Sequence, residues 1–366
     1  MLRQYIISRD DSVYECFPDV VKTKSGKLIC VFRESTHHGD LNNSRLVLTE
    51  SLDGGKTWSA KKGLTEKVDA THAYNCPRIS CMASGELVII CDNLNRIENE
   101  DLLVDCEQHI FRSFDDGETW SEPERFPLKG IVPDKYRELS NGRHIFGIHR
   151  RDPETKKLTQ YAYYSDDGGK TWTETVIASD ARFELCEVSI LEIENGTLVA
   201  FMRENSLLGY SCKKAISHDF GSTWEGVYDT NIDCCHRPVV ERCSNGMYLM
   251  TYRFMQGGKG WVGHWTQNLF GAFFNESTAL ATRRKEHSVR IFPISFDRSP
   301  RSDMGYSGWV ELEPDRFYVV NYLLDDAPKA QIRGYEFEMS DVISRHTSCG
   351  VKNCPISNSF FASAYS

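Results

Sequence analysis

One short pattern, Ser-x-Asp-x-Gly-x-Thr-Trp, occurs four times in this 366-residue chain and constrains its fold more than any other feature. The four copies end at Trp58, Trp120, Trp172 and Trp224. Their spacing of about 50 to 60 residues fits one four-stranded propeller blade. In each copy the Ser and Asp side chains can accept bonds from backbone amides, glycine suits a turn with positive φ, and the Trp ring can pack beside it. The pattern predicts one such hairpin turn per blade.

A calcium loop is the competing interpretation of the same pattern. Ca²⁺ takes six to eight oxygen ligands, and a single acidic ligand per turn is too few to hold it. We therefore interpret the four turns as structural. No metal and no cofactor is expected.

A second repeat consists of an apolar strand, a turn that usually contains glycine, and another apolar strand. Six such hairpins occupy residues 18–33, 77–90, 133–148, 187–203, 238–253 and 306–320. They predict an all-β fold, a six-bladed β-propeller over residues 1–345 with a tail at 346–366. We expect the isolated strand 3–8 to close the ring by pairing with 331–339. The long segment 256–303 has room for an insertion or irregular strands.

Composition excludes some classes of partner. Lys and Arg number 43 against 52 Asp and Glu, a net charge of −9, and no basic run marks a nucleic-acid surface. No apolar segment approaches the ~20 residues that span a bilayer, so no membrane partner is expected. The N-terminus lacks the apolar region of a secretory signal. We expect a cytoplasmic protein if the sequence is the whole precursor, and a secreted one if a signal was removed.

The Asp-containing turns at one-blade spacing resemble those of the sialidase superfamily. Two segments are similar to the catalytic segments of that family. The segment from Glu187 to Arg203 looks like the one that carries the acidic partner of the nucleophile and, one hairpin later, a carboxylate-binding arginine. The Tyr306-Ser307 pair is similar to the segment that carries the nucleophilic tyrosine. The resemblance implies an axial sugar-binding pocket.

The chemistry of sialic acid explains why a tyrosine is needed. The sugar carries a carboxylate on its anomeric carbon, which would repel an Asp or Glu nucleophile but not a neutral Tyr activated by a nearby Glu. The resemblance therefore implies that Tyr306 is the nucleophile and Glu187 its base. We expect the two side chains to lie within hydrogen-bond reach.

A general acid is also required, and the family takes it from the loop between the first hairpin and the first turn repeat. Asp40 occupies that loop and is the candidate by position. His37 and His38 are rivals because the ordinary pKa of histidine lies nearer neutrality.

The chain departs from the family at the first hairpin, where an Arg-Ile-Pro sequence is replaced by Cys16-Phe17-Pro18. That arginine belongs to a cluster of three that binds the substrate carboxylate through paired hydrogen bonds. Other residues at hairpin starts and ends, or shortly before the nucleophile, are candidates to supply the contacts: Arg33, Arg78, Arg203, Arg237, Arg253, His236 and Arg290. We expect Arg203 to converge with at least one of Arg78, Arg237 and Arg290.

These observations favour an exo-acting, retaining glycoside hydrolase whose partner is a carbohydrate with a terminal acidic sugar, sialic acid or a relative. Two alternatives remain open. A polysaccharide lyase would use Tyr306 or His236 as base on a uronate-containing glycan, with arginines neutralising the carboxylate. A non-catalytic sugar-binding propeller would need only the pocket.

Overall fold

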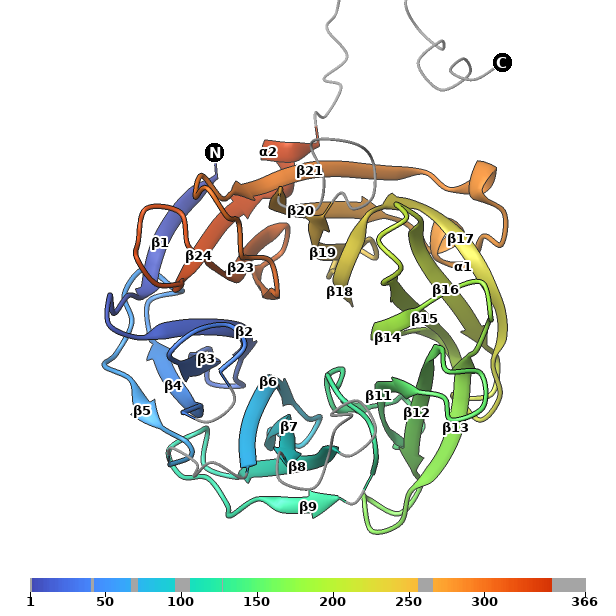
Figure 1. Ribbon diagram of the computed structural model, residues 1–366, viewed down its shortest axis with the longest axis horizontal. Coiled ribbons are helices and arrows are strands. Elements are labelled where there is room, and N and C mark those ends of the chain that lie inside the picture. The colour runs from blue at the N-terminus through green and yellow to red at the C-terminus, as the bar shows by residue number, and fades with distance from the viewer. Residues whose placement is uncertain are drawn as a thin grey trace, which may run out of the picture.

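Six four-stranded antiparallel sheets form a ring in the computed structural model of the protein (Figure 1). The structure describes residues 2–40, 43–66, 72–95, 106–126, 128–255 and 266–343. The ring confirms the predicted six-bladed β-propeller. The predicted tail at 346–366 lies outside the described residues.

The first three blades follow one another along the chain, each beginning at its innermost strand. Blade 1 contains β2 (Tyr14–Lys22), β3 (Leu28–Ser35), β4 (Arg45–Ser51) and β5 (Lys62–Gly63). Blade 2 contains β6 (His72–Cys81), β7 (Leu87–Asn95), β8 (Cys106–Ser113) and β9 (Glu124–Phe126). Blade 3 contains β10 (Arg137–Glu138), β11 (His144–Arg151), β12 (Leu158–Ser165) and β13 (Thr173–Ala178).

The last three blades complete the ring. Blade 4 contains β14 (Leu185–Glu194), β15 (Thr197–Glu204), β16 (Ser211–Ser217) and β17 (Glu225–Asp233). Blade 5 contains β18 (Cys235–Arg242), β19 (Tyr248–Met255), β20 (Gln267–Phe274) and β21 (Val289–Phe296). Blade 6 contains β22 (Gly308–Glu313), β23 (Arg316–Leu323), β24 (Gln331–Glu338) and β1 (Arg3–Ser8).

The N-terminal strand closes the ring as predicted. β1 pairs antiparallel with β24, with Arg3 opposite Glu336 and Ser8 opposite Ile332. In Figure 1 the blue β1 lies beside the orange-red β24. Because this sheet joins the two ends of the chain, blade 6 cannot form until both are in place.

Blade 5 carries the insertion that the long segment 256–303 predicted. Two short helices, α1 (Glu276–Leu280) and the 3₁₀ helix η2 (Arg284–Glu286), lie between β20 and β21. A third, α2 (Met339–Val342), follows β24. Among the described residues, no helix is long and apolar enough to cross a membrane.

The inner strands of neighbouring blades are joined by side chains that accept backbone hydrogen bonds. Asp19 of β2 accepts from Ile79 N of β6 at 3.0 Å. Ser189 Oγ of β14 accepts from Val240 N of β18 at 3.1 Å. These bonds, together with apolar packing between adjacent sheets, fix each blade against the next and hold the axis-facing residues in place.

Each Asp-containing turn joins the third and fourth strands of its blade, far from the axis, as predicted. In the first copy Ser51 Oγ donates to Asp53 Oδ1 at 2.9 Å and accepts from Gly55 N at 2.9 Å. Asp53 Oδ1 also accepts from Thr57 N at 2.9 Å, and Trp58 Nε1 donates to Gly55 O at 3.0 Å. The Ser and Asp bonds recur in the other three copies. The recurring bonds within each turn therefore stabilise the hairpin between the third and fourth strands of the blade.

The turn carboxylates predict an acid-dependent loss of stability. Hydrogen bonds from the Thr hydroxyl and amide lower the pKa of Asp53, Asp115 and Asp167 to about 2. Because these pKa values are depressed in the folded state, the stabilisation is complete above about pH 4 and disappears as pH falls through about 2. Replacing all three with Asn is expected to flatten the decline of Tm between pH 4 and 2, measured by circular dichroism. An unchanged decline would contradict this origin.

Candidate active site

The innermost strands present side chains to the axis through a repeated irregularity. In β2, β6, β14 and β18 the pairing register shifts beside a non-glycine residue with positive φ: Phe17 (57°), Cys76 (45°), Glu187 (41°) and Arg237 (53°). Such bulges add a residue to one strand and redirect its side chain. Positive φ costs such residues of order 1 kcal/mol or more, so the surrounding sheet must impose it.

Tyr306 is in direct contact with Glu187 and Arg203, although it comes from blade 6 and the other two from blade 4. Tyr306 precedes β22, and its Oη donates a short hydrogen bond to Glu187 Oε1. Arg203 Nη1 lies 3.0 and 2.8 Å from the two carboxylate oxygens of Glu187 and 3.3 Å from Tyr306 Oη. The predicted contact between Tyr306 and Glu187 is confirmed; their catalytic roles stay predictions.

Charge and burial determine which of the two groups, the Glu187 carboxylate or the Tyr306 phenol, holds the proton. Burial works against ionisation of Glu187, but the positive charges of Arg203, Arg237 and Arg253 lower its pKa to about 2. Burial and the neighbouring carboxylate raise the pKa of Tyr306 well above its ordinary value. The pair is therefore an ionised carboxylate and a neutral phenol at neutral pH. A neutral nucleophile beside an anionic base is the state that attack on an anionic sugar requires.

Three arginines surround the tyrosine. The guanidinium carbons of Arg237 and Arg253 lie 5.0 and 5.1 Å from the centre of the Tyr306 ring. Arg203 Nε, Arg237 Nη1 and Arg253 Nε are buried nitrogens without a hydrogen-bond partner among the described residues. Arg203 and Arg237 converge as predicted. The three cations form a positive cluster suited to a carboxylate.

Arg253 was one of the candidate arginines at hairpin ends, and the structure places it beside the ring of Tyr306. Its strand position matches that of Arg203. Arg203 lies opposite Cys186 on the second strand of blade 4, and Arg253 lies opposite His236 on the second strand of blade 5, each just before the bulge. Aligning the hairpins by their bulges, rather than by their first residues, places both arginines at one level of the ring.

Arg78 is buried next to the backbone that carries Tyr306. It is 3% exposed, and its Nη1 donates to the carbonyl oxygen of Ser307 at 2.8 Å and lies 3.4 Å from Asp19 Oδ1. Burial and the nearby charge of Arg237 lower its pKa to about 10. Arg78 therefore holds the backbone beside Tyr306, and its binding of substrate stays a prediction.

The prediction that Arg290 belongs to the site is wrong. Arg290 lies on β21, the outermost strand of blade 5, where it is exposed and its Nε donates to the carbonyl oxygen of Val342 at 3.1 Å. Arg290 was a candidate because the family's third arginine lies shortly before the nucleophile in sequence. In this chain the residues shortly before Tyr306 include β21, the outer strand that follows the blade 5 insertion.

Arg33 binds the loop that carries Asp40. It is buried, its Nη1 donates to Asn75 Oδ1 at 2.6 Å, and its Nη2 donates to the carbonyl oxygens of His38 and Asp40 at 2.8 and 3.0 Å. These bonds use its guanidinium to fix the loop between β3 and β4. The structure therefore gives Arg33 a positioning role, and its predicted contact with substrate remains a prediction.

Asp40 itself is 6% exposed and contributes to the shape of its own loop. Its carboxylate accepts from Thr36 N at 3.2 Å and from Asn43 N at 3.3 Å. An acid must present its proton to the leaving oxygen, within about 3 Å. Asp40 would have to give up these loop bonds to do so. Its predicted role as general acid stays a prediction.

Two buried histidines lie close to Tyr306 and Glu187. His236 is 3% exposed, with Nδ1 3.4 Å from Arg253 Nη2, and burial together with the charges of Arg203 and Arg253 lowers its pKa well below the ordinary value. His149, which sequence reasoning missed, accepts at Nδ1 from Glu187 N at 3.2 Å. Burial lowers its pKa to about 4. Both imidazoles are neutral, and His149 fixes the Glu187 bulge.

Cys16, at the position where the family resemblance implied an arginine, is fully buried opposite Arg33. Burial raises the pKa of its thiol to about 12. Phe17 instead reaches the site, with its ring 5.1 Å from the ring of Tyr306. The first blade therefore offers an aromatic surface where a guanidinium was expected from the family pattern.

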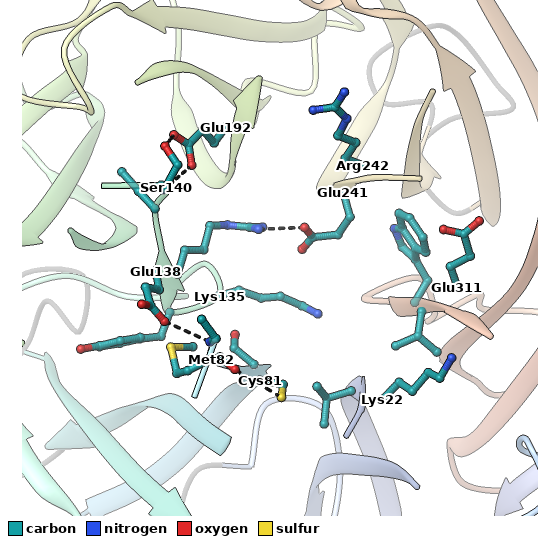
Figure 2. A pocket seen from close by; sticks show the side chains of 18 of the residues that line it. Lys22, Cys81, Met82, Lys135, Glu138, Ser140, Glu192, Glu241, Arg242 and Glu311 are labelled. Atoms are coloured by element: carbon teal, nitrogen blue, oxygen red, sulfur yellow. Dashed lines mark hydrogen bonds and ion pairs between the residues drawn. The ribbon is translucent and has the colours of Figure 1, made fainter. Parts of the chain in front are cut away.

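A cavity of about 920 Å³ opens at the opposite end of the axis, lined by the far ends of the inner strands (Figure 2). Its charged side chains are largely paired: Arg137 Nη1 lies 2.9 Å from Glu241 Oε2, and Ser140 donates to Glu192 at 2.6 Å. Lys135 Nζ lies 3.6 Å from Asp19 Oδ1. None of the predicted site residues lines this mouth.

The chain is similar to a repeat-domain family and to sialidases. A family model described as a BNR repeat-like domain matches residues 70–239. A sialidase of Bacteroides fragilis (strain YCH46) is 26% identical over 263 residues, covering 59% of this chain and 44% of that protein. The chain spans less than half the length of the curated relatives it matches.

Solved structures share the propeller. A protein of unknown function from Dyadobacter fermentans superimposes with a TM-score of 0.75 at 21% identity, covering 92% of this chain and 99% of that one. The Hadza microbial sialidase Hz136 gives a TM-score of 0.71 at 17% identity, covering 93% of this chain and 69% of that one. At these identities the similarity shows the fold.

Proposed function

We propose that this chain is a member of the sialidase superfamily, an exo-acting glycoside hydrolase that releases a terminal acidic sugar, sialic acid or a close relative. The observation that carries the proposal is the contact of Tyr306, Glu187 and Arg203 beside Arg237 and Arg253. A tyrosine-carboxylate pair inside a cluster of cations matches the charge of such a substrate. The carbohydrate is the expected partner.

The proposed reaction proceeds in two displacements. Tyr306 Oη attacks the anomeric carbon and passes its proton to Glu187, while the glycosidic bond breaks and an acid protonates the leaving oxygen. Water then attacks the same carbon and gives a proton to the deprotonated acid, the bond to Tyr306 breaks, and the phenolate recovers its proton from Glu187. Two inversions return the starting configuration.

The arginines link substrate binding to the activation of Glu187. In the free protein they hold the pKa of Glu187 at about 2, which makes it a poor proton acceptor. A bound substrate carboxylate shares their positive charge, so the stabilisation of ionised Glu187 falls and its pKa rises. Binding of the acidic sugar therefore prepares Glu187 to take the proton of Tyr306.

An activity screen tests the proposal. Aryl glycosides of sialic acid, of uronic acids and of neutral hexoses are compared, and we expect turnover of an acidic sugar with little of the neutral ones. Proton NMR should find the retained anomer as the first product. A product absorbing in the near ultraviolet would indicate the lyase alternative, and binding without turnover would indicate a non-catalytic propeller.

A further inference from the structure

His38 is held at the rim of the site by both its backbone and its ring. Its carbonyl oxygen accepts from Arg33 Nη2 at 2.8 Å, and its Nδ1 lies 2.7 Å from Asp303 Oδ2. Its side chain nevertheless remains 51% exposed. The loop between β3 and β4 thus presents a fixed imidazole to solvent.

Asp303, which lies just before Tyr306 in sequence, is itself fixed. It accepts hydrogen bonds from the hydroxyls of Tyr14 and Tyr322, the latter at 2.8 Å, and its N donates to Asp297 Oδ2 at 3.1 Å. Burial opposes its ionisation, but the bonds from His38 and the two tyrosines keep its pKa below the ordinary value. An anionic partner requires a proton on Nδ1 of His38. The second ring nitrogen, Nε2, is then the atom that exchanges a proton.

One aromatic ring separates His38 from the nucleophile. The ring of Phe17 lies 5.2 Å from that of His38 and 5.1 Å from that of Tyr306. Phe17 thus packs between the two rings, and a sugar bound over Phe17 would lie beside both Tyr306 and His38.

We infer that His38, oriented by Asp303, is the general acid of this site, and that Asp40 shapes the loop that carries it. The inference rests on the proposed function and deepens it. It differs from the family pattern, in which the loop supplies a carboxylic acid. His38 would be the catalytic residue and Asp303 a positioning residue.

His38 transfers one proton in each of the two displacements. As the glycosidic bond breaks, protonated His38 gives its Nε2 proton to the leaving oxygen, which departs as an alcohol, and the imidazole becomes neutral. In the second displacement neutral His38 takes a proton from water as the water oxygen bonds to the anomeric carbon. The imidazolium is thereby restored, and Tyr306 leaves with the proton held by Glu187.

Leaving-group dependence tests the assignment. An aryl sialoside has a leaving group that needs little protonation, whereas sialyllactose expels a sugar alcohol that needs a proton. His38→Asn is expected to lower kcat/KM on sialyllactose by ~10²–10⁴-fold and on the aryl sialoside by less than ~10-fold. Because water activation also needs His38, the aryl substrate should show a pre-steady-state burst.

Matched variants separate catalysis from folding. His37→Asn changes the neighbouring histidine, whose ring makes no hydrogen bond to any described residue, and should leave both rates unchanged. His38→Gln and Asp303→Asn should reproduce the selective loss on sialyllactose, the second to a smaller extent, with Tm measured for each. Equal losses on both substrates, or a selective loss in Asp40→Asn instead, would overturn the assignment while leaving hydrolysis intact. A wild-type protein inactive on both substrates would overturn the proposed function with it.

Discussion

Tyr306→Phe is expected to lower kcat by on the order of 10³-fold or more on an acidic aryl glycoside, with little change in Tm. The substitution removes only Oη, the atom that donates to Glu187 and would attack the anomeric carbon. The ring keeps its contact with Phe17 and with the faces of Arg237 and Arg253. Steady-state kinetics and thermal unfolding measure the two effects.

Tyr318→Phe is the matched control. Tyr318 is fully buried, and its hydroxyl donates to the carbonyl oxygen of Gly55 at 2.7 Å, in an Asp-containing turn. Its loss should lower Tm and leave kcat unchanged. If Tyr306→Phe instead retained kcat within a few fold, a tyrosine nucleophile would be excluded.

Arg203→Ala is expected to lower kcat/KM for the acidic sugar by ~100-fold or more, because it removes charge-assisted bonds to Glu187 and to the substrate carboxylate. Tm should also fall, since the variant breaks a buried ion pair. Kinetics on the sugar and on its methyl ester measure the part that depends on the substrate's charge.

Comparing the acidic sugar with its methyl ester distinguishes loss of substrate-carboxylate binding from a general loss of activity. Arg253→Ala offers a second variant, since Arg253 faces the ring of Tyr306 and shows no hydrogen bond to Glu187. Both variants should lose more activity on the carboxylate than on the ester. Equal losses on acid and ester would exclude a role in carboxylate recognition.

Local sequence patterns were sufficient to predict the structure where the contacts that determine it join residues close in sequence. The bonds of each turn repeat join residues within four positions, such as Ser51 and Gly55, so the sequence predicts their geometry directly. The apolar hairpins gave the number of blades for the same reason. Ring closure by residues 3–8 followed because a propeller without it would leave an unpaired strand.

The contact of Glu187 with Tyr306 was predicted through family resemblance, and its electrostatics were not. The pKa of Glu187 depends on Arg203, Arg237 and Arg253, which come from two blades. No spacing in the sequence gives the distance between side chains on different sheets. The sequence therefore offered both Arg253 and Arg290 as candidates, and only the structure places Arg253 beside Tyr306 and Arg290 on an outer strand.

The sequence by itself determined the six-bladed ring, its turns and its closure, because short-range periodicity and blade order specify them, whereas the pairing of Tyr306 with Glu187 was implied by the family resemblance. Only the tertiary structure decided which side chains meet at the site. Bulges at Phe17 and Glu187 redirect their side chains, and Arg33 and Asp40 form hydrogen bonds within the loop between β3 and β4. Depth in the blade and side-chain direction result from packing between sheets, which no single strand's pattern encodes.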